Sequence, residues 1–234
     1  MTKKAWIIFA AACVVLFGII IVLNKKPSID VSNVDASKIV TGTYADHVFG
    51  NAKSKIVLVE YGDFQCPYCG DAYSKVKAVS QTYKDQVAVI FRNYPLTTAH
   101  PNALASATAA EAAAKQGKFW EMHDMLYENQ NSWSDASTDQ RDAYFEGYAK
   151  ALGLNVDKFK ADELSSSVAD KISFDQALGN KQRVQGTPAF YLNGKAVDQT
   201  TSGDIINGDG SKLEAQLDTL IKKDGGTPPT KSTS

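Results

Sequence analysis

The feature that most restricts the fold is a pair of cysteines, two residues apart, placed where a buried strand gives way to a helix. Residues 55–61 (KIVLVEY) are a short β-branched run typical of a central strand. A turn leads to the CPYC motif at 66–69, and apolar residues recur at helical spacing over 71–83. A sulfur at a helix N-terminus is stabilised as a thiolate, with its pKa lowered from ~8.5 to about 3.5–7.5. Cys66 is therefore predicted to be the nucleophile.

The other residues of the motif take complementary places. Pro67 fits the first helical turn, where its missing N–H has no partner to lose. Cys69, one turn further in, is predicted to be the buried resolving thiol. A zinc site needs two further ligands, and His47, His100 and His123 are scattered without a second CxxC or an HxxxH spacing. The sequence predicts no metal site, while an inert disulfide stays open as an alternative.

The remaining pattern predicts an α/β domain over residues 46–224, interrupted by a helical insertion at about 96–183. Further strands are predicted at 87–92, 189–192 and 195–197, with a hairpin turn at Asn193-Gly194 and a final helix at 211–222. Residues 27–45 are polar and Ser/Asp-rich, which indicates a spacer and entry segment. The Gly-, Pro- and Thr-rich stretch 225–234 is predicted to be disordered.

The first segment indicates the compartment. Residues 5–23 are 19 uncharged, mostly apolar residues between two lysine pairs, close to the ~20 that cross a bilayer as a helix. We therefore expect residues 1–26 to form a signal anchor, with the catalytic domain on the extracytoplasmic side of the cell membrane. A cleaved signal peptide is the alternative, although its apolar stretch is usually only ~7–15 residues long. Cys13 lies inside the run and is interpreted as a small apolar residue without function.

Composition excludes two classes of protein. Twenty-five basic and 26 acidic residues give a net charge of -1, so the electrostatic footprint of a nucleic-acid-binding protein is missing. Three cysteines in 234 residues are far too few for a disulfide-stapled scaffold.

Three stretches together resemble the DsbA family of disulfide oxidoreductases, particularly its Gram-positive membrane-anchored members. They are residues 59–69 (VEYGDFQCPYC), 100–103 (HPNA) and 186–194 (GTPAFYLNG). A CPYC motif alone also occurs in glutaredoxins. The resemblance implies a thioredoxin fold, a central mixed sheet with an inserted helical domain, and no soluble cofactor. It also implies two kinds of partner, exported cysteine-containing proteins and a membrane-bound reoxidising or reducing partner. A reoxidising partner would be a quinone-linked membrane protein or a second thiol oxidase.

The resemblance assigns roles to further residues. Pro188 matches the family's cis-proline beside the sulfurs, with a trans proline at a strand start as the alternative. Thr187 would present its backbone to a client strand. Glu60 matches a buried acid that moves protons to or from the resolving cysteine, unless it is a partly exposed acid at a strand end. Tyr68 replaces the histidine of the best-known oxidising member and so removes one hydrogen-bond donor to the thiolate.

The resulting hypothesis is an oxidase that introduces disulfides into exported proteins through Cys66 and Cys69. A reductase or isomerase of the same fold is the first alternative, and a redox-inert chaperone or interaction module is the second. His100 and His123 are expected to be structural. The tryptophans of the insertion, Trp120 and Trp133, are expected in its core rather than in a substrate groove.

Overall fold

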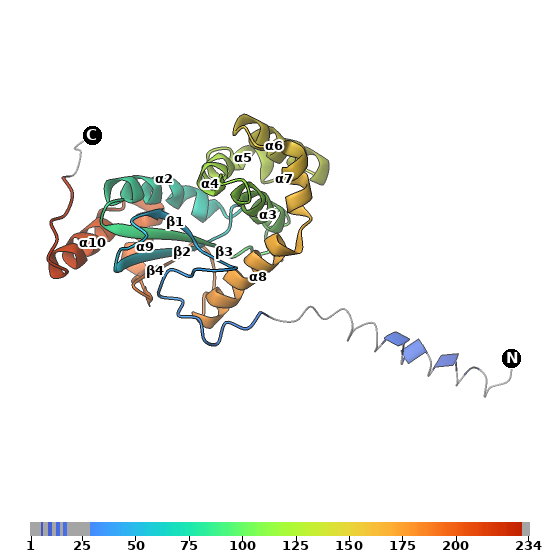
Figure 1. Ribbon diagram of the computed structural model, residues 1–234, viewed down its shortest axis with the longest axis horizontal. Coiled ribbons are helices and arrows are strands. Elements are labelled where there is room, and N and C mark those ends of the chain that lie inside the picture. The colour runs from blue at the N-terminus through green and yellow to red at the C-terminus, as the bar shows by residue number, and fades with distance from the viewer. Residues whose placement is uncertain (1–5, 7–8, 11–12, 15, 18–28, 231–234) are drawn as a thin grey trace. The chain divides into compact units, whose positions relative to one another are not determined.

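The computed structural model describes residues 6, 9–10, 13–14, 16–17 and 29–230 (Figure 1). By its internal contacts the chain divides into two units, residues 1–30 and 31–234. The predicted anchor, residues 1–26, lies for most of its length outside the described residues. Within the described part of the chain, no helix combines the length and the apolar character needed to cross a membrane.

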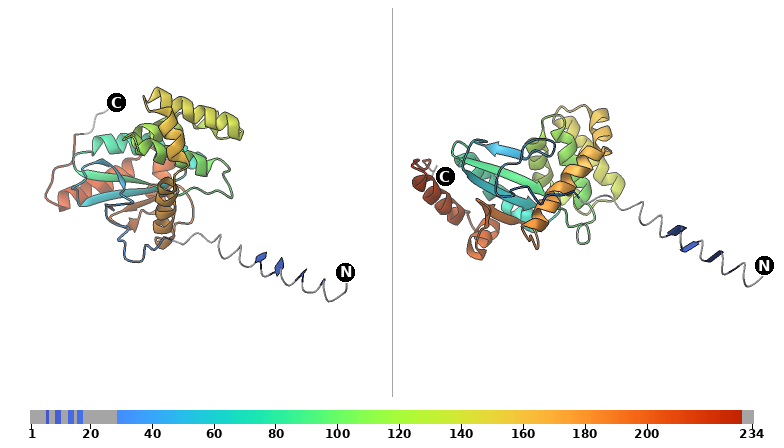
Figure 2. Two further views of the ribbon diagram at one scale, coloured as in Figure 1. Left: turned by 45° about the vertical axis from the view of Figure 1, so that its right-hand side comes forward. Right: turned by 60° about the horizontal axis from the view of Figure 1, so that its bottom comes forward.

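A mixed sheet of five strands forms the centre of the second unit (Figures 1 and 2). Its order is β1-β3-β2-β4-β5, with β2 and β3 parallel and the other neighbours antiparallel. Every residue of β2 and β3 is buried, as expected of apolar strands covered on both faces. The bounds are β1 His47–Gly50, β2 Ile56–Gly62, β3 Val87–Asn93, β4 Ala189–Leu192 and β5 Lys195–Ala196. The expected central mixed sheet is confirmed.

Helices flank this sheet, and a helical block lies beside it (Figure 1). Helices α2 and α10 pack against one face, where Leu58 and Val89 meet Val76 and Leu217 in one apolar cluster. Helices α3 to α8 make up the insertion, and α8 runs along β3. The bounds are α2 Pro67–Thr82, α3 Ala103–Ala114, α4 Phe119–Glu128, α5 Gln130–Trp133, α6 Thr138–Ala151, α7 Val156–Glu163, α8 Ser166–Lys181, α9 Gln199–Asn207 and α10 Ser211–Lys223. The insertion predicted at about 96–183 agrees with α3 to α8.

Some elements differ from the sequence expectation. Helix α2 begins at Pro67, in agreement with the first-turn position predicted for it, although the apolar periodicity starts only at residue 71 because the first turn is the cysteine motif. Helices α5, α7 and α9 were not predicted. The α9 sequence begins QTTSG, a stretch of low helix propensity. Its helix is held by an N-cap, in which the Asp198 side chain accepts from the Thr201 N–H, and by the fully buried Ile205.

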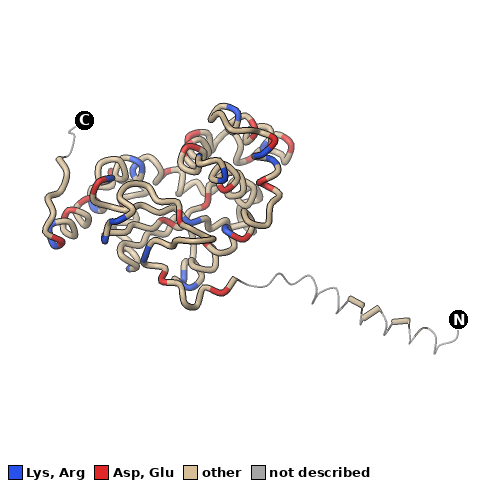
Figure 3. Tube along the Cα trace, viewed as in Figure 1, with Lys and Arg blue, Asp and Glu red and all other residues tan. Residues whose placement is uncertain are grey.

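Basic and acidic residues are interspersed along the chain of the domain (Figure 3). Several of them are buried, namely Glu60, Asp63, Arg92, Glu111, Lys171 and Asp175. A buried charge is costly unless it is paired and hydrogen-bonded. The positions of these residues therefore show where the fold depends on polar contacts.

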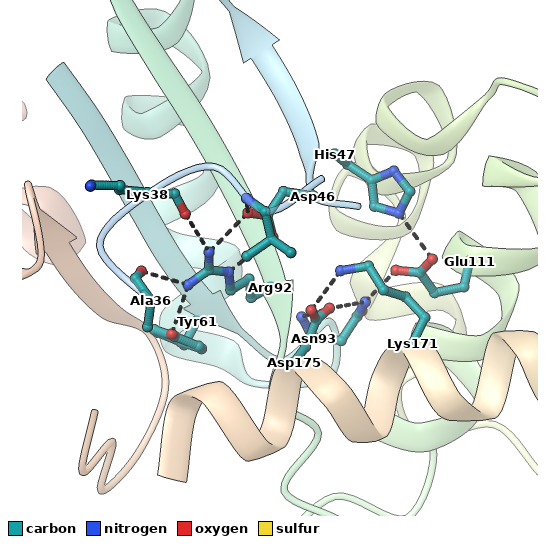
Figure 4. Close-up of polar contacts among 11 residues, drawn as sticks. Ala36, Lys38, Asp46, His47, Tyr61, Arg92, Asn93, Glu111, Lys171 and Asp175 are labelled. Atoms are coloured by element: carbon teal, nitrogen blue, oxygen red, sulfur yellow. Dashed lines mark hydrogen bonds and ion pairs between the residues drawn. The ribbon is translucent and has the colours of Figure 1, made fainter. Parts of the chain in front are cut away.

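Arg92 attaches the chain that precedes the sheet. Its guanidinium makes two hydrogen bonds with Asp46, at 3.0 and 2.8 Å, and both side chains are fully buried (Figure 4). It also donates to the carbonyl oxygens of Ala36 and Lys38 and to the Tyr61 hydroxyl. Residues 31–46 thus pack on the domain, and the contacts of the folded unit extend to Val31, earlier than the predicted boundary at residue 46.

A second buried cluster joins the insertion to the sheet (Figure 4). Lys171 donates to Asp175 at 2.6 Å, and Asp175 accepts from the Asn93 backbone N–H at 3.1 Å. The Asn93 side chain donates to Glu111 at 2.7 Å, and Glu111 lies 2.9 Å from His47. These contacts link β1, β3, α3 and α8, so the insertion has a fixed position beside the end of β3.

Candidate active site

Cys66 caps the N-terminus of α2, directly after the turn that follows β2. Its backbone is extended, with φ -68° and ψ 122°, and Pro67 occupies the first helical position. Pro67 and Tyr68 are exposed, Tyr68 to 62%, whereas Cys66 is 3% and Cys69 0% exposed. Both cysteines of the motif are free thiols. The structure therefore places the pair where the spacing predicted it, beneath an exposed dipeptide.

The turn between β2 and Cys66 is built by Asp63, which the sequence analysis did not single out. Its backbone carbonyl accepts from the Cys66 N–H at 3.0 Å, and its carboxylate accepts from the Gln65 N–H at 2.8 Å. The other carboxylate oxygen accepts from the Leu96 N–H and lies 2.7 Å from His100 Nδ1. The sequence signal for this role is weak. It consists of an aspartate whose side chain can accept a hydrogen bond from the backbone N–H two residues further along the chain. His100 thus has the structural role expected of it.

The peptide bond between Thr187 and Pro188 is cis, as the family resemblance implies. The Cys66 thiol donates to the Thr187 carbonyl oxygen at 3.3 Å. The Thr187 hydroxyl is buried and has no hydrogen-bond partner among the described residues. Residues 187 and 188 are therefore brought beside the cysteines from a segment 121 residues away.

The surroundings shift the pKa values of the two thiols in opposite directions. A hydrogen bond from Cys69 lowers the pKa of Cys66 to about 6, with further contributions from the Thr187 side chain and the backbone N–H groups of Cys69 and Tyr68, against an opposing effect of burial. Burial raises the pKa of Cys69, as do its hydrogen bond to Cys66 and the charge of Glu60. The pair thus has one thiol that ionises easily and one that holds its proton.

Glu60 lies in the middle of the sheet, between Phe91 of β3 and Phe190 of β4. It is 4% exposed, so the alternative of a partly exposed strand-end acid is wrong. Burial, followed by the charge of Cys66, raises its pKa to about 8. Glu60 also lines a small cavity of about 40 Å³ with Tyr127 and other side chains. A cavity of this size with polar groups on its wall can hold a water molecule.

Glu60→Gln should remove the pH dependence of stability that Glu60 gives the natural protein. The Glu60 pKa is about 8 in the folded protein against 4.5 for an unperturbed glutamate, so the folded protein binds this proton more tightly. The natural protein therefore loses stability as pH rises from about 4.5 to about 8, and the variant does not. The expected gain of the variant is near zero at pH 4 and on the order of 4 kcal/mol at pH 9.

Urea unfolding of the oxidised proteins at pH 4, 7 and 9 measures this difference in a form that has no thiols to titrate. The Cys66 charge is absent from that form, while burial, the larger cause of the raised Glu60 pKa, remains. Glu163→Gln, on α7, is the matched control, because burial raises the pKa of that carboxyl to about 7 away from the cysteines. It should also gain stability with pH, but leave the rate of disulfide exchange unchanged. Equal stability of Glu60→Gln and the natural protein at all three pH values would contradict the buried, protonated Glu60.

Two glutamines from different elements hold the loop before Cys66, and the sequence analysis identified neither. Gln130, the first residue of α5, donates to the carbonyl oxygens of Phe64 and Cys66. Gln65 donates to the Ser134 carbonyl oxygen at 2.7 Å. No local sequence pattern marks these residues, because each donates to a backbone carbonyl more than sixty residues away in the sequence. The insertion therefore contacts the motif directly.

The aromatic residues of the insertion are mainly core residues. Trp133 is fully buried, and its indole N–H donates to the Leu126 carbonyl. His123 is buried among aromatic rings, with Phe91 at 4.8 Å between ring centroids, and burial lowers its pKa. Trp120 is half-buried and lines the cavity beside Glu60. The preference for a core over a groove is confirmed for Trp133, and His123 is packed as expected.

Among the described residues, no group of three or more His, Cys, Asp or Glu side chains is arranged to hold a metal ion.

Comparison with known proteins identifies the family and the fold. The family model described as Thioredoxin matches residues 43–208. A thioredoxin-like oxidoreductase from Silicibacter pomeroyi DSS-3 superposes with a TM-score of 0.60 at 25% identity, over 76% of this chain and 92% of that one. The thiol-disulfide exchange protein alpha-DsbA2 from Wolbachia pipientis gives a TM-score of 0.62 at 19% identity, over 75% and 87% of the two chains, which shows a shared fold.

A relative of a different kind shares one domain with this chain. The Na(+)/H(+) antiporter NhaA 3 of Salinispora tropica is 40% identical over 150 residues, which are 64% of this chain. The chain spans only 22% of the length of that antiporter, so the antiport activity in its name is not carried over. The matched family model covers well over half of the chain, so this chain belongs to the thioredoxin family, and it shares its fold with the solved thioredoxin-like and thiol-disulfide exchange proteins.

Proposed function

We propose that this protein is an oxidase that introduces disulfide bonds into exported proteins through Cys66 and Cys69. The proposal rests on the opposite pKa shifts of the two thiols. The pKa of Cys66 is lowered to about 6, and that of Cys69 is raised. A thiol that ionises easily is a good leaving group, and stabilising its thiolate favours the reduced form of the enzyme. The more stable the reduced form is, the stronger an oxidant the disulfide form becomes.

The reaction starts from the Cys66–Cys69 disulfide. A client thiolate attacks the sulfur of Cys66, forming a mixed disulfide and releasing Cys69 as a thiolate. Cys69 takes up a proton, for which the source is the buried Glu60 on β2, whose charge acts on Cys69 and whose pKa is about 8. The second client thiolate then attacks the client sulfur of the mixed disulfide and releases Cys66. Two electrons pass from the client dithiol to the enzyme.

The cycle closes when a membrane-bound partner takes those two electrons and restores the Cys66–Cys69 disulfide. The apolar run at residues 5–23, between two lysine pairs, supports tethering to the cell membrane with the catalytic domain outside. Such tethering keeps the domain near both exported clients and a membrane-bound partner. The chemistry uses the protein's own sulfurs and needs no soluble cofactor.

The reduction potential of the Cys66–Cys69 couple tests the direction of the reaction. Full-length protein is equilibrated with glutathione buffers, and the oxidised fraction is read from the mass of the peptide that carries both cysteines. A potential near that of strong oxidants, about -120 mV, supports the oxidase. A value near about -270 mV would instead identify a reductase, with the same residues working in the opposite direction.

A further inference from the structure

Gln130 lies against the motif from outside the thioredoxin core. Its side-chain Nε2 donates to the carbonyl oxygen of Phe64 at 2.7 Å and to that of Cys66 at 2.9 Å. Both amide hydrogens are thus used, one on the Phe64–Gln65 peptide group and one on the Cys66–Pro67 peptide group. The residue is the first of α5, so this contact comes from the helical insertion.

The Cys66 carbonyl accepts the first backbone hydrogen bonds of α2. It accepts from the Cys69 N–H and from the Gly70 N–H, each at 3.1 Å, and Gln130 supplies a third donor. The orientation of this peptide group sets where the backbone N–H groups of Tyr68 and Cys69 lie relative to the Cys66 sulfur. Those N–H groups are among the donors that stabilise the thiolate. A donor that fixes the Cys66 carbonyl therefore acts on the sulfur through the backbone.

The fit of the Gln130 side chain is close. A Cβ atom placed on Gly70 would lie 2.5 Å from Gln130 Oε1, so the amide lies directly against the first turn of α2. Gln65, between the two held peptide groups, is itself bound to the Ser134 carbonyl. Three consecutive residues, 64 to 66, are thus held by a short stretch of the insertion, 130 to 134.

We propose that Gln130 is a positioning residue for the thiol chemistry, through which the helical insertion sets how strongly the reduced form of the Cys66–Cys69 pair is stabilised. The inference rests on the proposed function, because it concerns the same pair. Loss of the amide should free the Cys66 peptide group, weaken the contacts to the thiolate and make the protein a weaker oxidant. The effect is one of position, since Gln130 touches neither sulfur in the described contacts.

Gln130→Leu tests the proposal, because leucine has a similar volume and no donor. In full-length protein, the pH midpoint of Cys66 alkylation, followed by mass spectrometry of the motif peptide, should move upward. The equilibrium constant with glutathione should shift about three- to tenfold towards the disulfide form, the range expected for one hydrogen bond. Gly70→Ala, whose new methyl group displaces the amide, should shift both quantities in the same direction.

Gln116→Leu is the matched control. Gln116 also bridges to backbone within the insertion, accepting from the Asn155 N–H at 3.0 Å and donating to its carbonyl at 3.1 Å. It should lower the thermal midpoints of the oxidised and reduced forms equally and leave the alkylation profile unchanged. Gln130→Leu should instead reduce the amount by which the thermal midpoint of the reduced form exceeds that of the oxidised form.

The outcomes separate this inference from the proposed function. An unchanged alkylation midpoint and glutathione equilibrium in folded Gln130→Leu would overturn the role of Gln130 while leaving the oxidase intact. If Gln130→Leu does not fold, the same two measurements on Gly70→Ala decide. A natural protein whose Cys66 is not acidic, or whose motif does not form a disulfide, would overturn the proposed function itself.

Discussion

Full-length protein carrying Cys69→Ser, treated with oxidised glutathione, stops at a mixed disulfide through Cys66, whereas Cys66→Ser forms none at the motif. The reason is the asymmetry of the pair. The Cys66 thiolate attacks glutathione disulfide and releases one glutathione, and the natural protein then resolves the adduct with Cys69. Without Cys69 the adduct persists. Without Cys66 the remaining thiol is fully buried, and burial raises its pKa, so it has little thiolate to react.

Mass spectrometry of the motif peptide distinguishes these results, since one glutathione adds a fixed mass. Both variants should lose essentially all catalysis of client oxidation, while Cys13→Ser should retain it, because the proposed exchange uses only Cys66 and Cys69. Adduct formation by Cys66→Ser at the rate of the natural protein would contradict the assignment of Cys66 as the nucleophile. Full turnover by Cys69→Ser would contradict a two-cysteine mechanism.

Asp46→Ala is expected to cost about 3–5 kcal/mol of folding free energy, the range for removing one partner of a buried ion pair. Both Asp46 and Arg92 side chains are fully buried, and the carboxylate accepts two of the guanidinium's hydrogen bonds. Its removal leaves a positive charge in the core with only neutral acceptors, the Ala36 and Lys38 carbonyls and the Tyr61 hydroxyl. Urea unfolding at pH 7 measures the loss.

Two further variants make this result interpretable. Glu121→Ala removes an ion pair with Lys118 in which both side chains are more than 40% exposed, and its cost should stay below about 1 kcal/mol. Arg92→Met combined with Asp46→Ala should recover part of the loss, since no uncompensated charge remains. If the double variant is as unstable as the sum of its single changes, the instability does not come from the orphaned charge.

The strand–motif–helix unit could be predicted from local sequence. A β-branched run, a turn and a CxxC motif specify where Cys66 and Cys69 lie, because the information is contained in about thirty consecutive residues. The hairpin at Asn193-Gly194 is of the same kind, and Asn193 has a φ of 49°, in the left-handed region that asparagine tolerates. Only the family resemblance suggested the cis bond at Pro188, since periodicity carries no sign of it.

The sequence by itself thus determined the sheet, the helical insertion and the position of the reactive pair, since apolar periodicity and turn residues act over short distances. Tertiary structure decided how the pair is held. Asp63 meets His100, and Gln130 meets the Cys66 carbonyl, across separations of 37 and 64 residues. Residues 31–46, polar enough to indicate a spacer, are bound to the domain in large part because Arg92 is buried where it can reach Asp46 and two backbone carbonyls. Such contacts depend on which side chains the packed fold brings together, and no local pattern records them.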